Sequence, residues 1–220
     1  MQKGSAGGAH VIARNLSCPE GLALDGEGQN VYVVENPVGN ECEQPVRKDS
    51  AQLTRINIQS GSQTRIALLR SSRNGEEGGP HGLAIQGDSA YVCECPEGDA
   101  SLTKVNLHNG NKTQVVALRS PSGCAVGGSH AFVVEQGEDD GSLVMVDLKT
   151  HVKSTLLSNL EGPMGVAVDE ENDFVYVAPR HKNEVIRFNL LSGEKHIIAE
   201  SDKRPFNSPI GLSTIPSARV

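Results

Sequence analysis

The stretch Gly79-Pro80-His81-Gly82-Leu83-Ala84-Ile85, followed by Ala90-Tyr91-Val92-Cys93-Glu94, decides the fold because it recurs along the chain. Each copy begins with Pro-x-Gly and a small apolar run, makes a polar turn, and continues into an apolar strand that carries an aromatic residue. Further copies begin at Pro19, Pro121 and Pro163, and a fifth begins at Pro209 close to the end of the chain. The shared glycines recur at intervals of about forty residues, which is the length of one propeller blade.

The second half of each repeat predicts two more strands. Alternating apolar and polar residues, typical of a half-buried strand, occupy 53–58, 102–107, 143–148 and 185–190. A turn and a further short apolar segment follow each of them, so every repeat predicts four antiparallel strands. The first repeat is longer because a polar insertion occupies 36–52. We therefore expect four blades at approximately 17–69, 79–119, 121–158 and 162–200.

The two ends of the chain predict a fifth, split blade. Residues 8–13 resemble 194–199, the outermost strand of the fourth blade, and 208–220 restart the innermost strand. Joining strands from both ends of the chain removes exposed sheet edges. The fold class is therefore an all-β propeller in one domain, 1–220, with the split blade made from 8–14 and 208–220. Three alternatives stay open: a five-bladed ring, a fragment of a larger propeller, and an oligomer whose copies complete one another.

Composition narrows the classes of partner. The chain has 220 residues, 24 glycines and no tryptophan, and its formal net charge is -7. Proteins bind the phosphates of nucleic acids with clustered lysine and arginine residues. The sequence shows no such cluster, so we expect no nucleic-acid partner. No apolar run reaches the length of about eighteen residues that a membrane-spanning helix needs. Residues 1–8 lack the apolar core of a secretory signal, which predicts a cytoplasmic location by default.

Five cysteines allow two interpretations. None forms a Cys-x-x-Cys pair, and the spacing of Cys93 and Cys95 is too tight for an ordinary zinc knuckle. One interpretation is that all are reduced, half-buried structural thiols. The other is a disulfide between Cys42 in the insertion and Cys95, which would indicate an oxidising, extracellular environment.

One face of the propeller is predicted to be acidic. In an up-and-down blade, the loop entering the first strand and the loop leaving the second lie on the same face. The middle residues of the Pro-x-Gly motifs therefore meet at the mouth of the central channel: Glu20, His81, Ser122, Met164 and Ile210. Acids that end second strands, and acids in the loops that follow, share this face: Glu35, Glu94, Glu135, Glu41, Glu43, Glu97, Asp99, Glu138, Asp139 and Asp140. The fourth blade differs, because its loop carries Arg180 and His181.

Converging carboxylates attract cations, because each raises the pKa of the others unless a cation lies between them. The sequence therefore predicts that Glu35, Glu94 and Glu135 bind a divalent ion such as calcium, magnesium or manganese. His81 lies beside them by its place in the repeat, and neutral imidazole can accept a proton. The alternative is structural: an acid at a strand end can accept hydrogen bonds from loop amides. Glu20, Ser122, Arg180 and His181 complete the predicted ligand-contacting set.

The repeat pattern resembles the NHL-type propeller over nearly the whole chain. It is also similar to gluconolactonase and strictosidine-synthase-like propellers, whose hydrolytic members bind a metal at first-strand motifs. Its short sequence motifs resemble those of virginiamycin B lyase-like propellers, in which a Pro-His motif acts beside a strand-end Glu and a divalent metal. That resemblance implies that Pro80-His81-Gly82 carries the proton-transfer residue and that Glu94 and Glu135 hold the metal. The chain departs from the lyase pattern in its third strands and in having one Pro-His site.

Two classes of function follow. The first is a binding or scaffold module whose acidic face takes a protein, a small ligand or a cation, with the insertion 36–52 as its recognition element. The second is a divalent-metal-dependent hydrolase, similar to lactonases, or a lyase that uses His81 and the channel glutamates. The arrangement of Glu35, Glu94 and Glu135 separates them, because only the second class needs these side chains around one cation.

Overall fold

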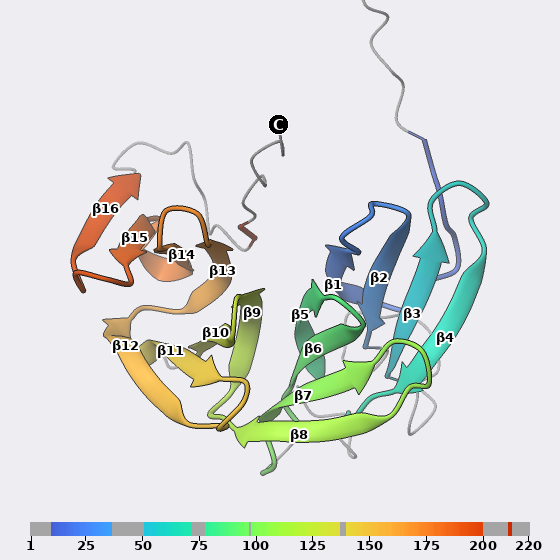
Figure 1. The fold of residues 1–220 in the computed structure, drawn as a ribbon, viewed down its shortest axis with the longest axis horizontal. Coiled ribbons are helices and arrows are strands. Elements are labelled where there is room, and N and C mark those ends of the chain that lie inside the picture. Colours follow the sequence, from blue (N-terminus) through green and yellow to red (C-terminus); the bar gives the residue numbers. More distant parts are fainter. Residues whose placement is uncertain are drawn as a thin grey trace, which may run out of the picture.

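The protein consists of antiparallel sheets placed side by side around a common centre (Figure 1). The computed structural model describes residues 10–36, 51–71, 78–96, 98–136, 140–199 and 211–212. These residues form four four-stranded sheets, and in each sheet the strands are neighbours in chain order. The first strand of each sheet lies nearest the centre and the fourth lies on the perimeter. These are propeller blades, and the predicted fold class is confirmed.

The sixteen strands of the described residues divide evenly among the blades. Blade 1 contains β1 (Pro19–Leu24), β2 (Asn30–Glu35), β3 (Gln52–Asn57) and β4 (Gln63–Leu68). Blade 2 contains β5 (Pro80–Gln86), β6 (Ser89–Glu94), β7 (Ser101–Asn106) and β8 (Lys112–Ala117). Blade 3 contains β9 (Pro121–Gly127), β10 (His130–Glu135), β11 (Gly141–Asp147) and β12 (Lys153–Leu160). Blade 4 contains β13 (Pro163–Asp169), β14 (Phe174–Pro179), β15 (Val185–Asn189) and β16 (Lys195–Ala199), with a 3-10 turn η1 (Arg180–Lys182) between β14 and β15.

An asparagine or aspartate is the last residue of the third strand in every blade, and its side chain stabilises the turn that follows. The side-chain oxygen of Asn106 accepts hydrogen bonds from the backbone N–H groups of His108 and Asn109, at 3.0 and 3.1 Å. Asp147 and Asn189 accept the equivalent pairs of bonds in blades 3 and 4. Such local bonds favour turns over continued strand. This explains why the outer hairpin has the same shape in each repeat.

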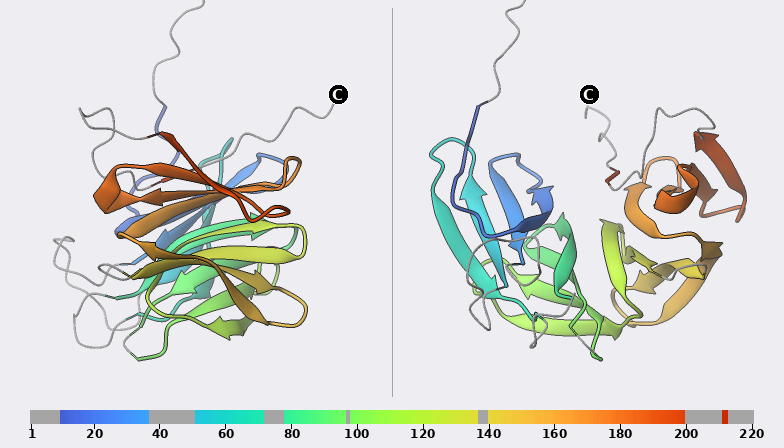
Figure 2. Two further views of the ribbon diagram at one scale, coloured as in Figure 1. Left: turned by 90° about the vertical axis from the view of Figure 1, so that its left-hand side faces the viewer. Right: turned by 180° about the vertical axis from the view of Figure 1, so that it is seen from behind.

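Apolar side chains from neighbouring blades form the core. Three clusters of buried residues lie between blades 1 and 2, blades 2 and 3, and blades 3 and 4. Valine, leucine, isoleucine and alanine dominate them, with one aromatic ring per second strand at Tyr32, Tyr91 and Phe132. Figure 2 shows the sheets stacked face to face in the side view. Each blade is therefore stabilised mainly by its neighbours, as in other repeat proteins.

Blade 1 leaves one apolar face uncovered among the described residues. Leu83, Cys124 and Val166 occupy the same repeat position on β5, β9 and β13, and their exposed fractions are 8%, 8% and 6%. Leu22, at this position on β1, is 71% exposed. Figure 1 shows the reason, because blades 1 and 4 form the two ends of an open arc.

The contrast between Leu22 and Leu83 predicts unequal costs of truncation. Leu83→Ala should lower the free energy of unfolding by about 3 kcal/mol, because it removes buried methyl groups and leaves a cavity. Leu22→Ala should change it by about 0.5 kcal/mol or less, as at other exposed positions. Chemical denaturation of both variants measures the difference. Equal costs would mean that another sheet covers β1 in solution.

The described part of the N-terminal segment takes the place of an outer strand. Residues 10–17 form no strand. Their backbone carbonyl groups nevertheless contact blade 1 in the same way as the carbonyl groups of β4 contact blade 2. Gln63 donates from Nε2 to the Arg14 carbonyl at 2.9 Å, and the equivalent Lys112 donates from Nζ to the Leu68 carbonyl at 2.7 Å. A Cβ added at Gly61 would lie 2.8 Å from the Ile12 carbonyl.

These contacts are those expected of the outer strand of a split blade. The remainder of that predicted blade, 8–9, 208–210 and 213–220, falls outside the described residues, as does most of the insertion. Closure of the ring therefore stays a prediction.

Candidate functional site at the channel mouth

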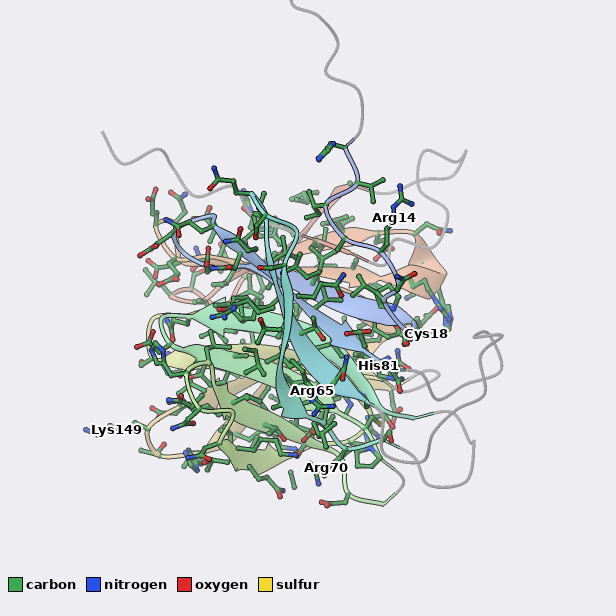
Figure 3. The ribbon with its side chains drawn as sticks, turned by 90° about the vertical axis from the view of Figure 1, so that its right-hand side faces the viewer. Arg14, Cys18, Arg65, Arg70, His81 and Lys149 are labelled. Carbon is green, nitrogen blue, oxygen red and sulfur yellow. The ribbon has the colours of Figure 1, made fainter. Side chains whose placement is uncertain are left out.

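The predicted channel mouth is the end of the blades at which inner strands begin and second strands end. The inner strands β1, β5, β9 and β13 contact one another in that order. In Figure 3, Cys18 and His81 lie toward one end of the molecule and Lys149 lies at the opposite end. The motif residues Glu20, His81, Ser122 and Met164 each occupy the second position of an inner strand. The repeat therefore brings them to the same end of the inner strands.

Glu20 and His81 form a pair that joins blades 1 and 2. Oε2 of Glu20 lies 3.7 Å from Nδ1 of His81, and their side chains are 43% and 37% exposed. The pair is held by neighbouring inner strands, so its position depends on the scaffold and not on a loop. This contact between two predicted site residues is therefore open to a ligand.

Ser122 and Met164 take part in contacts between blades 3 and 4. Ser122 is 7% exposed, and its hydroxyl donates to the Pro163 carbonyl at 3.0 Å. Nε2 of Gln136 lies 2.6 Å from the Met164 sulfur. The Ser122 hydroxyl is therefore directed at the backbone of the next blade.

The strand-end glutamates are buried, each within its own blade. Glu35, Glu94 and Glu135 are 3%, 1% and 6% exposed. Each accepts a hydrogen bond from a backbone N–H that precedes the inner strand: Ser17 for Glu35 at 2.7 Å, Arg70 for Glu94 at 2.7 Å, and Arg119 for Glu135 at 2.8 Å. Each also accepts a bond from a hydroxyl on the third strand: Thr54, Thr103 and Ser142, respectively. We call this repeated arrangement the carboxylate latch.

A further donor completes each latch. Nε2 of Gln52 donates to Glu35 at 2.8 Å, and Nε of Arg70 donates to Glu94 at 3.0 Å. Nζ of Lys153 lies 3.2 Å from Glu135. A buried carboxylate needs such partners because burial removes its hydration. The latch ties the connection before each inner strand to the second and third strands, which is a structural role.

The three glutamates are not brought around one point. Across residues 10–36, 51–71, 78–96, 98–136, 140–199 and 211–212, no group of three or more His, Cys, Asp or Glu side chains could hold a metal ion. All three glutamates instead accept hydrogen bonds from backbone N–H groups, as in the structural alternative in which strand-end acids bond loop amides. In the sequence, this structural role is indicated by a hydroxyl residue on the third strand of each blade: Thr54, Thr103 and Ser142.

Loop acids of the predicted acidic face are paired with arginine. Asp99 bonds Nη1 of Arg70, and Asp140 bonds Nη1 of Arg119 at 2.6 Å. The hydrogen bond from Arg119 to Asp140 raises the pKa of the guanidinium above its ordinary value. Residues 37–43, 97 and 137–139, which carry the other predicted loop acids, fall outside the described residues. The part of this face that the structure describes is therefore of mixed charge.

Blade 4 has no glutamate at the end of its second strand, but it keeps the backbone bond after that strand which blades 1 to 3 also make, for example from Asn36 to the Cys18 carbonyl. Ala178 and Pro179 stand where other blades end in valine or cysteine and then glutamate. The N–H groups of Arg180 and His181 donate to the carbonyls of Gly162 and Glu161, at 3.1 and 3.2 Å. Among residues 180–182, Arg180 is half-buried and the next two are exposed.

Two side-chain contacts order this cationic turn. Nη2 of Arg180 lies 3.2 Å from Nε2 of His181. Nζ of Lys182 lies 2.9 Å from Glu161, and this hydrogen bond raises the pKa of the lysine. The channel mouth therefore presents Glu20 and His81 on blades 1 and 2 and a cationic turn on blade 4.

The predicted Cys42–Cys95 disulfide is wrong, because Cys95 is a free thiol. Cys93 and Cys124 are also free, and both are buried between blades 2 and 3. A hydrogen bond with Cys124, together with burial, raises the pKa of the Cys93 thiol well above its ordinary value. Cys18 is disulfide-bonded, and Cys42 falls outside the described residues. A high pKa keeps Cys93 in its unreactive thiol form.

No helix in the described part of the chain has the length and apolar character needed to cross a membrane.

Comparison with known proteins identifies the fold. No family model matches the chain, and the search of curated proteins found no match. Among solved structures, a chain in the crystal structure of a nidogen/laminin complex is similar, with a TM-score of 0.71 and 14% sequence identity. The match covers 90% of this chain and 69% of that chain. In total 468 chains of solved structures match, so the likeness is to a widespread architecture. At this identity it shows that the chain folds as a β-propeller.

Proposed function

We propose that the protein is a β-propeller binding module that uses the channel mouth to bind a protein partner. The observation that supports the proposal is the carboxylate latch, in which the buried glutamates accept hydrogen bonds within their own blades. The groups left to contact a ligand are the exposed pair Glu20 and His81 and the cationic turn 180–182. Neighbouring inner strands hold Glu20 and His81, and blade 4 holds the cationic turn; a rigid scaffold lowers the entropic cost of binding.

The likeness to a propeller solved in a nidogen/laminin complex supports a role of this kind. Opposite charges at the two ends of the arc favour a partner with complementary charge, because such complementarity selects partners and speeds encounter. The insertion 36–52 follows β2 in the sequence, and we propose that it extends the contact surface.

Charge reversal at the mouth tests the proposal. We expect the double variant Glu20→Lys, His81→Glu to lose the proteins that the immobilised wild-type chain retains from its source extract. Lys149→Glu is the matched control, because Lys149 lies at the opposite end of the molecule (Figure 3) and is exposed. Quantitative mass spectrometry of the retained proteins is the readout. Retention of the same proteins by the double variant would rule out the channel mouth as the binding face.

A second candidate is the metal-dependent hydrolase or lyase, and the contact between Glu20 and His81 favours it. A carboxylate beside an imidazole can hold a divalent cation or transfer a proton. Manganese would take ligands from both members of this pair, whereas calcium or magnesium, which prefer oxygen ligands, would bind the Glu20 carboxylate. The oxygens of the latch glutamates already accept several hydrogen bonds.

Thermal melting of metal-stripped protein separates the two candidates. For the enzyme we expect millimolar calcium, magnesium or manganese to raise Tm by about 5 °C, because an ion that binds only the folded state stabilises it. For manganese, His81→Gln should abolish the rise, whereas His151→Gln, in an outer turn of blade 3, should retain it. Such a result would justify assays for lactone hydrolysis and for elimination. An unchanged wild-type Tm would remove the support for the second candidate.

A further inference from the structure

Arg180 differs from the arginines that blades 2 and 3 place at the channel mouth. Arg70 bonds Glu94 at 3.0 Å, and Arg119 bonds Asp140 at 2.6 Å. The first of these acids ends the second strand of blade 2, and the second lies in the loop between β10 and β11 of blade 3. Among the residues that the structure describes, Arg180 has no carboxylate partner, although it lies at the same end of the blades.

The acids near this part of blade 4 are directed at another cation. The second strand ends in Pro179, where the other blades have glutamate, and the turn η1 follows directly. Glu161 forms an ion pair of 2.9 Å with Lys182, and the charge of Glu184 also acts on that lysine. The guanidinium of Arg180 is therefore left without a carboxylate contact from the described part of its own blade.

Blade 4 holds Arg180 in place through its backbone and through one side-chain contact. The Arg180 N–H donates to the Gly162 carbonyl at 3.1 Å. Nη2 of Arg180 lies 3.2 Å from Nε2 of His181, and the imidazole nitrogen accepts this bond because a guanidinium can only donate. The His181 ring lies against Gly162, since a Cβ added there would be 2.8 Å from it. A guanidinium has five N–H groups, so the contact with His181 leaves Nε and Nη1 for a ligand.

We propose that Arg180 binds a carboxylate group of the protein partner, which takes the place that acids of the chain itself take at Arg70 and Arg119. This inference rests on the proposed function and names the chemistry that its cationic end recognises. A guanidinium and a carboxylate are both planar and can form two parallel hydrogen bonds, each roughly twice as strong as a bond between neutral groups. Arg180 is half-buried, and a less polar surrounding strengthens such bonds further.

Titration of isotopically labelled protein with short peptides tests the proposal and identifies the source of the carboxylate. Acetyl-Gly-Gly-Gly carries only a C-terminal carboxylate, and acetyl-Gly-Glu-Gly-amide carries only a side-chain carboxylate. Acetyl-Gly-Gln-Gly-amide carries neither and is the control probe. We expect the backbone amide signals of His181 and Lys182 in the NMR spectrum to shift saturably with at least one of the first two peptides and not with the third.

Three variants show whether the binding depends on the guanidinium of Arg180. Arg180→Gln should weaken the binding of the carboxylate peptide by about tenfold or more, since hydrogen bonds between charged groups are lost. Arg119→Gln is the matched control and should keep wild-type affinity, because it removes one positive charge from the same face at a guanidinium already paired with Asp140. Arg180→Lys should recover part of the affinity, because lysine restores the charge without the planar fork. Thermal melting of each variant verifies that it is folded.

The proposal is overturned if neither carboxylate peptide binds, if the glutamine peptide binds equally well, or if Arg180→Gln and Arg119→Gln bind alike. A failure of the proposed function is detected separately, by the retention of partner proteins on the Glu20→Lys, His81→Glu variant, which keeps Arg180. If that variant loses the retained proteins while Arg180→Gln keeps all of them, the proposed function stands and a carboxylate contact at Arg180 is ruled out.

Discussion

Glu94→Gln is expected to lower the free energy of unfolding by about 3 kcal/mol, because it takes the charge from a buried, fully partnered carboxylate. Glu94 is 1% exposed and accepts bonds from the Arg70 backbone, the Arg70 guanidinium and the Thr103 hydroxyl. A glutamine amide has one acceptor oxygen and an NH₂ group that would face one of these donors. Urea denaturation followed by circular dichroism measures the change.

Asp99→Asn is the matched control, because Asp99 pairs with the same arginine but its side chain is 64% exposed. An exposed ion pair contributes about 0.5 kcal/mol, so this variant should unfold close to the wild type. If Glu94→Gln instead matched or exceeded wild-type stability, repulsion among the glutamates would be the better description. The cation-binding interpretation of the strand ends would then regain its support.

The propeller could be predicted from the sequence because its signals are local and repeated. Pro-x-Gly before a small apolar run, alternation in 53–58 and 102–107, and a short polar residue before each outer turn all specify structure within one blade. Repetition then fixes the packing, since each blade meets its neighbour in the same way. The match between residues 8–13 and 194–199 likewise led to an outer-strand role, and the contacts of Ile12 and Arg14 follow that pattern.

The candidate site was less predictable, because the sequence places residues on a face without giving the direction of their side chains. Glu35, Glu94 and Glu135 end second strands as expected, yet their carboxylates turn into their own blades toward hydroxyls on the third strands. The repeat pattern does not single out Arg70 and Arg119, although each precedes a Pro-x-Gly motif and bonds a loop acid. In the part of the chain that the structure describes, the contact between Glu20 and His81 joins two predicted site residues across blades.

Gly123→Ala is expected to destabilise the propeller by about 3 kcal/mol or more, as severe overpacking does. A Cβ at Gly123 would lie 2.2 Å from the Met164 carbonyl of the next blade. Gly21 and Gly82 meet the carbonyls of His81 and Ser122 in the same manner, at 2.2 and 2.7 Å. The obstacle is backbone in a packed inner strand, so the two blades must move apart to admit even one methyl group.

Gly26→Ala is the control that isolates this effect, since a Cβ at Gly26 would have no atom within 4 Å. Both variants lose the same backbone freedom in the unfolded chain, which by itself favours alanine slightly. Thermal melting should therefore show a large loss for Gly123→Ala and none for Gly26→Ala. Equal melting temperatures would show that the inner strands are farther apart in solution. Since these contacts set the distance between blades, such a result would also remove the rigid support on which Glu20 and His81 depend.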